Sequence, residues 1–69
     1  MKYAVVFEKS ETGWGAYLPD LPGCVAVDST FEGCKKLIGE AVNLHLATMR
    51  ADGDDIPEPT TVVDFVQVA

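Results

Sequence analysis

The fold of this protein is decided by the stretch Trp14-Gly15-Ala16-Tyr17-Leu18-Pro19-Asp20-Leu21-Pro22-Gly23-Cys24-Val25-Ala26-Val27-Asp28. Its two ends are short apolar runs that are typical of β-strands. Between them, the two prolines lack the backbone donors that a strand ladder needs, and Gly23 adopts positive φ at little cost. The stretch therefore predicts two antiparallel strands, over 14–18 and 24–28, joined by a tight connection.

Two more strands are predicted outside this stretch. Residues 2–8 are rich in β-branched and aromatic side chains and predict a strand, which a polar loop ending at Gly13 joins to the next one. Residues 60–68 predict a final strand. With the helix described below, the order is βββαβ, so residues 1–69 predict a single α+β domain in which one helix packs on an antiparallel meander.

The helix is predicted between the third and fourth strands. A hydroxyl three residues before an acidic residue is the spacing of a capping box, and either Ser29 or Thr30 can provide the N-cap. Gly53 is a natural stop after the last turn. On a 3.6-residue wheel, one side of this helix is mainly apolar. That side contains Phe31, Cys34, Leu37, Ile38, Ala41, Leu44, His45 and Thr48.

Composition limits the function classes. The chain has 69 residues, a formal net charge of −6 and 48% hydrophobic residues. It is too apolar for a disordered acidic tail and too acidic for nucleic-acid phosphates to be its main partner. A domain this small buries little surface alone, so we expect a protein partner or self-association.

Neither a targeting signal, a membrane span nor a metal site is expected. The apolar run after Lys2 stops at Glu8, which is too short for a signal-peptide core or a bilayer span, so we expect a cytoplasmic protein. In that reducing compartment Cys24 and Cys34 are expected to be free thiols. The single histidine, His45, leaves too few ligands for a metal, and no cofactor is expected.

The predicted first and last strands are apolar on both faces. In the last strand, Val62, Val66 and Val68 alternate with a second apolar set, Val63 and Phe65. One helix covers only one face of a sheet, so the other face is expected to contact another chain. Homo-oligomerisation is therefore predicted, and the interface candidates are Val62, Val66 and Val68. The alternative is ordinary scattered exposure of apolar side chains.

The sequence does not predict an enzyme. Four carboxylates could in principle hold Mg²⁺, namely Asp20, Asp28, Glu32 and Asp64. Acidic residues are, however, common in turns, at strand ends and at helix caps, where they have a structural role. His45 is expected to be a packed histidine rather than a general base. No nucleophile is paired with a base.

The turn Pro19-Asp20-Leu21-Pro22-Gly23-Cys24 resembles that of the HicB antitoxin family. The helix opening Thr30-Phe31-Glu32 is similar to the family's, and so is Gly53 followed by Ile56-Pro57-Glu58-Pro59 before the last strand. The resemblance covers essentially the whole chain. It implies a partial RNase H-like fold, in agreement with the βββαβ order.

The resemblance also implies a partner, a small basic HicA-like toxin that cleaves mRNA. An acidic protein suits the basic surface of such a toxin, which it would mask without chemistry. Longer members carry a DNA-binding module that has no counterpart here, so direct DNA binding is not expected. The alternative is a stand-alone homo-oligomeric domain with another protein or small-molecule partner. Candidate partner-binding residues are Trp14, Tyr17, Asp20, Asp54, Asp55 and Glu58.

Overall fold

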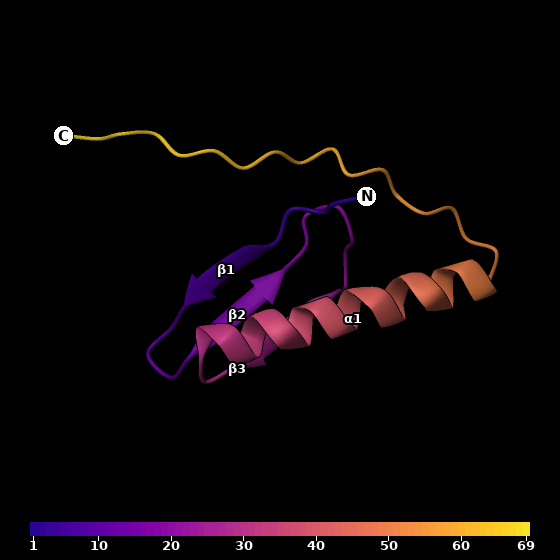
Figure 1. Cartoon of the computed structure of the whole chain (residues 1–69), viewed down its shortest axis with the longest axis horizontal. Helices are drawn as coiled ribbons and strands as arrows, with labels where there is room; N and C mark the ends of the chain where they lie inside the picture. Colours follow the sequence, from indigo (N-terminus) through magenta and orange to yellow (C-terminus); the bar gives the residue numbers. More distant parts are fainter.

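Three short strands and one long helix make up the ordered body of the molecule, as seen in a computed structural model that describes residues 1–69 (Figure 1). The strands are β1 (Val6–Lys9), β2 (Trp14–Tyr17) and β3 (Val25–Asp28), and the helix is α1 (Phe31–Ala51). The sheet is antiparallel, with the order β1-β2-β3. The predicted meander and the α+β class are therefore confirmed.

The strand register sorts side chains between the two faces of the sheet. Phe7 lies opposite Ala16, which lies opposite Ala26, so these three share the face that α1 covers. Tyr17 and Val25 lie opposite each other on the far face, which no element of the chain covers. The helix packs on β2 and β3 and leaves β1 at an open edge of the sheet.

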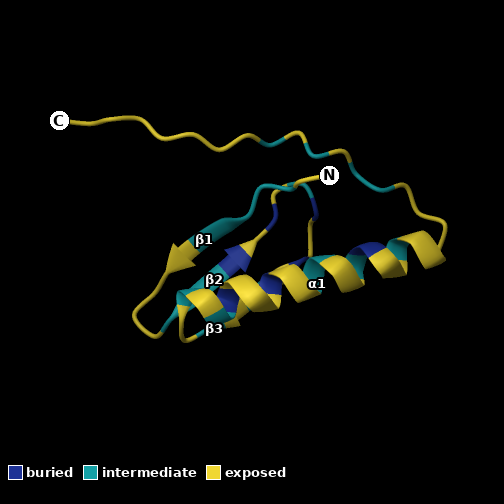
Figure 2. Cartoon of the chain, in the orientation of Figure 1, coloured by how far each residue is buried: buried dark blue, intermediate teal, exposed yellow.

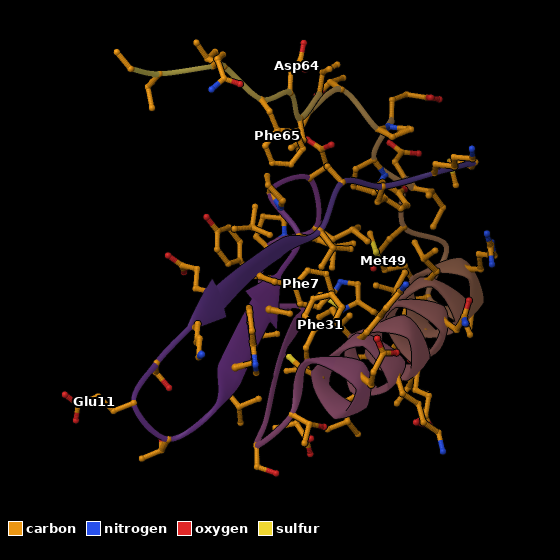
Figure 3. All side chains as sticks on the ribbon, turned by 60° about the vertical axis from the view of Figure 1, so that its left-hand side comes forward. Phe7, Glu11, Phe31, Met49, Asp64 and Phe65 are labelled. Atoms are coloured by element: carbon orange, nitrogen blue, oxygen red, sulfur yellow. The ribbon has the colours of Figure 1, made fainter.

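The core is small and lies between the sheet and α1 (Figure 2). Seven residues are buried. Beside them the Phe31 ring contacts Phe7 and Trp14, with centroid distances of 4.8 and 5.2 Å, and Figure 3 shows Phe7 and Phe31 meeting in this layer. Such aromatic pairs stabilise a core beyond the area that they bury. The buried residues are Ala16, Leu18, Leu21, Cys24, Cys34, Ile38 and Leu46.

Thr30, rather than Ser29, caps the helix. The Thr30 hydroxyl accepts a hydrogen bond from the Gly33 N–H at 3.0 Å, which satisfies one of the free donors of the first turn. The Asp28 carboxylate in turn accepts from the N–H and the hydroxyl of Thr30, each at 3.0 Å. This network fixes where the chain leaves β3 and enters α1. At the other end Gly53 has a φ of 74°, where glycine is the favoured residue.

The predicted apolar face of the helix is confirmed in part, because Cys34 and Ile38 are buried, whereas the two leucines of that face are not. Leu44 is 71% exposed and Leu37 is 41% exposed, although both were expected inside. Leu46 is buried instead, and Val42 and Met49 pack against the core. A helical wheel shows which residues share a side of the helix. It does not include the angle at which α1 crosses β2 and β3, and this angle changes which residues face the sheet from one turn to the next.

The predicted final strand over 60–68 is wrong for the single chain. After α1 the chain runs in extended form past the sheet, and none of these residues makes a hydrogen bond with the backbone of another part of the chain (Figure 1). Strand propensity reflects packing against a neighbouring strand, and here no neighbour is within reach. The first strand is also shorter than predicted and begins at Val6. The RNase H-like comparison, which needs the final strand, stays a prediction.

Candidate protein-binding site

An open groove of about 540 Å³ lies between the beginning of β3 and the C-terminal half of α1. Its floor includes Val25 and Leu44, which are 65% and 71% exposed and therefore offer apolar surface to a partner. His45 is half-buried and also lines this groove. Asp52 and Asp54 lie at its end. An apolar floor beside carboxylates matches the core and rim of many protein interfaces.

The acidic loop after α1 extends this groove. Asp54 and Asp55 are exposed in the segment that follows the helix stop, and Glu58 is exposed three residues after Asp55. Three of the six predicted partner-binding residues therefore lie on one segment beside an apolar groove. The acidic side chains of this segment are therefore concentrated next to the groove.

Asp20 lies elsewhere and already has partners inside the chain. Its carboxylate accepts hydrogen bonds from the backbone N–H groups of Thr60 and Thr61, both at 3.0 Å, and from their hydroxyls at 3.2 and 2.9 Å. The backbone N–H of Thr61, followed by its hydroxyl, holds the pKa of Asp20 below its ordinary value. We call this set of contacts the Asp20 latch. Nothing in the sequence pattern predicted it, because its members lie 40 and 41 residues apart.

The two predicted aromatic contacts, Trp14 and Tyr17, lie on opposite faces of β2. Trp14 is half-buried and its indole packs edge-on against Phe31, so it belongs to the core side. Tyr17 is 41% exposed on the face that α1 does not cover. The expectation that at least one of them lies away from the helix is confirmed, and Tyr17 is the one that a partner could reach.

The three oligomer-interface candidates, Val62, Val66 and Val68, lie on the extended C-terminal segment. All three are highly exposed, with Val62 at 87%. In Figure 3 the ring of Phe65 likewise projects from this segment, outside the layer that holds Phe7 and Phe31. The segment is joined to the body by the Asp20 latch and by a hydrogen bond that the Tyr3 hydroxyl donates to the Pro57 carbonyl.

The carboxylates considered for metal binding do not converge. Asp28 is engaged in the helix cap, and Asp64 accepts from the adjacent Phe65 N–H at 2.7 Å on the extended segment. No group of three or more His, Cys, Asp or Glu side chains is close enough to hold a metal ion. Cys24 and Cys34 are both buried free thiols, and burial raises the pKa of Cys24. No helix of the structure combines the length and apolarity that a bilayer crossing requires.

Comparison with known proteins gives a consistent picture. A family model described as the HicB-like antitoxin of a bacterial toxin-antitoxin system matches residues 3–68. The chain is 33% identical over 69 residues to a protein named antitoxin HicB 2 from Photorhabdus laumondii, a match that covers 99% of this chain and 50% of that protein. No solved structure gave a significant match.

Two further relatives carry less informative names. A UPF0150 protein from Helicobacter pylori is 40% identical over 47 residues, covering 68% of this chain and 65% of its own length. An uncharacterised 14.9 kDa protein of Haemophilus phage HP1 is 26% identical over 66 residues, covering 96% of this chain and 50% of its own length. The chain thus spans between half and two thirds of the length of these relatives.

Proposed function

The chain belongs to the HicB-like antitoxin family of bacterial toxin–antitoxin systems, and from this premise we propose that it binds and masks a small basic toxin of the HicA-like kind, which cleaves mRNA. The observation that carries the proposal is the family match over residues 3–68. The site of action would be the cytoplasm, where such a toxin meets its substrate.

The charge and shape of the surface support this partner. A toxin that grips RNA phosphates presents a basic surface, and this chain has a net charge of −6. The groove between β3 and α1 adds exposed apolar area at Val25 and Leu44, with Asp52 and Asp54 at its end. In the proposed complex the carboxylates of the acidic loop steer the toxin and the apolar floor retains it.

Inhibition by this protein would be occlusion rather than chemistry. The carboxylates are dispersed over the cap, the latch and the loop, so none of them completes a catalytic set with a neighbour. The protein would act by covering the surface on which the toxin binds RNA, and the strength of inhibition would follow the affinity of the complex.

The test is co-expression of this chain with a small basic protein, taken from the neighbouring reading frame where one is encoded there, followed by purification on a tag carried by one partner. We expect the two to purify together and growth arrest caused by the basic protein to be relieved. Association should slow as salt rises, because the screening length shortens from about 8 Å at physiological ionic strength to about 3 Å at 1 M. If the proteins do not purify together and arrest persists, the masking proposal is wrong.

Self-association is a second proposal, and a separate observation favours it. Val62, Val66, Val68 and Tyr17 leave apolar surface open on a chain with only seven buried residues. Small domains with so little core gain stability by burying such surface against another copy. Sedimentation at tens of micromolar should give a mass above the 7.4 kDa of one chain, and a single species at that mass would contradict the proposal.

A further inference from the structure

The C-terminal segment Val62–Val68, here called the tail, has the composition of a strand but no strand to pair with. Phe65 is 91% exposed, and four valines of the same segment are each more than half exposed. Its backbone donates and accepts no hydrogen bond with the rest of the chain. A segment rich in β-branched and aromatic residues does not have the polar composition of a disordered end. Its composition is instead that of a strand that packs against a neighbouring strand.

The sheet has an unpaired edge at β1, where a further strand could add. This strand pairs with β2 on one side only, and its other edge faces no element of the chain. An open edge carries unpaired N–H and C=O groups and is a template for an added strand. The charges of Glu8 and Lys9 stand at the end of β1, whereas the residues leading into it, Tyr3 and Val5, are apolar.

A second groove, of about 490 Å³, lies before β1 in the chain, between the N-terminal residues and the middle and C-terminal part of α1. Its apolar lining includes Val5 and Leu18 from the sheet side and Val42 and Leu46 from the helix. A strand that paired with β1 and continued past Val6, alongside the N-terminal residues, would turn alternate side chains toward this groove. Val63 and Phe65 share one side of the tail and are of a size to fill it. The side chains of Val62, Val66 and Val68 would extend the outer face next to Val6 and Tyr17.

The chain does not close its own tail onto this edge. The Asp20 latch holds Thr60 and Thr61, and beyond it Figure 1 and Figure 3 both show the tail diverging from β1. Each chain thus has both an unpaired strand-like tail and an unpaired strand edge, but it does not pair the two with each other. Two copies related by a twofold axis satisfy both at once, since each would offer a tail to the other.

We propose that two copies of this chain exchange tails, so that Val62–Val68 of each adds as an edge strand to β1 of the other. The inference deepens the proposed self-association and is independent of toxin binding. Exchange of two seven-residue tails makes two equivalent contacts, which brings the buried area toward the roughly 1,200–2,000 Å² of a stable complex. The final strand that the sequence predicts then exists, but only between chains.

The first test measures assembly. Phe65→Asp places a charge in the proposed contact without touching the core, and it should raise the dissociation constant of the dimer at least about 100-fold. The control is Leu44→Asp, another exposed apolar site, in the groove between β3 and α1, which should leave the dimer intact and weaken only toxin binding. Circular dichroism at helix wavelengths verifies that both variants fold. An unchanged dimer in Phe65→Asp would overturn the proposal.

The second test separates exchange from other modes of assembly. Full-length protein labelled with ¹⁵N is mixed with protein labelled with ¹³C, and filtered nuclear Overhauser spectra record contacts between copies only. We expect contacts between tail residues of one copy and Val6–Lys9 of the other. A dimer without these contacts would overturn exchange while keeping self-association, and tail contacts within one copy would overturn it in favour of self-closure. Failure to bind a toxin would leave both results unaffected.

Discussion

The Asp20 carboxylate accepts two hydrogen bonds from Thr61, from its backbone N–H at 3.0 Å and from its hydroxyl at 2.9 Å, across 41 residues of chain. Thr60 makes the same pair of contacts with this carboxylate. The turn between β2 and β3 therefore determines where the C-terminal tail begins. An aspartate that the sequence presents as an ordinary turn residue sets the direction in which an apolar segment leaves the body.

Replacing Asp20 with asparagine should loosen the base of the tail. The amide keeps one acceptor oxygen where the carboxylate has two, and it loses the charge that strengthens hydrogen bonds from N–H donors. We expect faster hydrogen exchange at the amides of Thr60 and Thr61, with the amides of α1 unchanged. Asp64→Asn is the control, because Asp64 contacts only its neighbour Phe65. Equal exchange in wild type and Asp20→Asn would show that the latch does not restrain these amides.

Acid should release the same latch. The pKa of Asp20 is lowered in the folded chain, chiefly by the backbone N–H of Thr61, so the latch contributes to stability fully above the unfolded-state pKa of about 3.9. That contribution is lost as the pH falls through the lower folded-state pKa. A carbon-detected NMR titration should find the Asp20 midpoint below 3.9, with the Thr61 amide resonance moving in step. A midpoint at or above the unfolded value would contradict this geometry.

The two glycines inside α1 should respond oppositely to alanine. Around Gly39 no atom lies within 4 Å of an added Cβ, so Gly39→Ala should raise the free energy of unfolding by about 1 kcal/mol through helix propensity. At Gly33 the added Cβ would lie 2.0 Å from the Asp28 carboxylate oxygen and 2.9 Å from the Thr30 hydroxyl. Displacing this cap offsets the propensity gain, and we expect a net loss of about 1 kcal/mol. Urea unfolding of both variants measures the difference, and equal stabilisation would contradict the cap network.

The two thiols should be free and slow to react. Cys24 and Cys34 are buried, and burial raises the pKa of Cys24, which lowers its thiolate fraction at neutral pH. In the absence of reductant, a thiol reagent should count two groups per chain after unfolding and react far more slowly before it. A count of zero after unfolding would mean that the two cysteines are bridged.

Charge reversal in the acidic loop should slow toxin association specifically. Asp54→Lys with Asp55→Lys should lower the association rate by up to about 10-fold if this loop faces the basic partner. The control pair, Glu8→Lys with Glu11→Lys, changes the net charge equally but lies at the β1–β2 end of the molecule. Stopped-flow mixing at low salt compares the two. Equal slowing by both pairs would indicate general attraction rather than steering by the loop.

Local features of this fold were predictable because each depends on a few neighbouring residues. The two prolines and Gly23 end β2 before β3 begins, and Gly23 indeed has a φ of 88°. The spacing of Thr30 and Gly53 marks both ends of α1 to within two residues. The choice between Ser29 and Thr30 as the cap was not predictable, because it depends on where the Asp28 carboxylate lies.

Of the candidate binding residues, the acidic loop was predictable and the rest of the site was not. Asp54, Asp55 and Glu58 are exposed, as expected for charged residues in a polar segment with two prolines after a helix stop. The groove beside them required the position of α1 on the sheet, which turned Leu44 outward and Leu46 inward. Helical periodicity gives the width of an apolar face, but the tilt of the helix determines which part of that face is covered.

The sequence by itself determined the three-stranded meander, the helix that follows it, the acidic charge and the strand-like character of residues 60–68. Only the tertiary structure decided that this last segment has no partner in its own chain, because strand pairing depends on which backbone edge is within reach. The Asp20 latch brings together residues 41 positions apart, so no local pattern encodes it. Propensity is a property of neighbouring residues, whereas the choice of a pairing partner is a property of the folded surface.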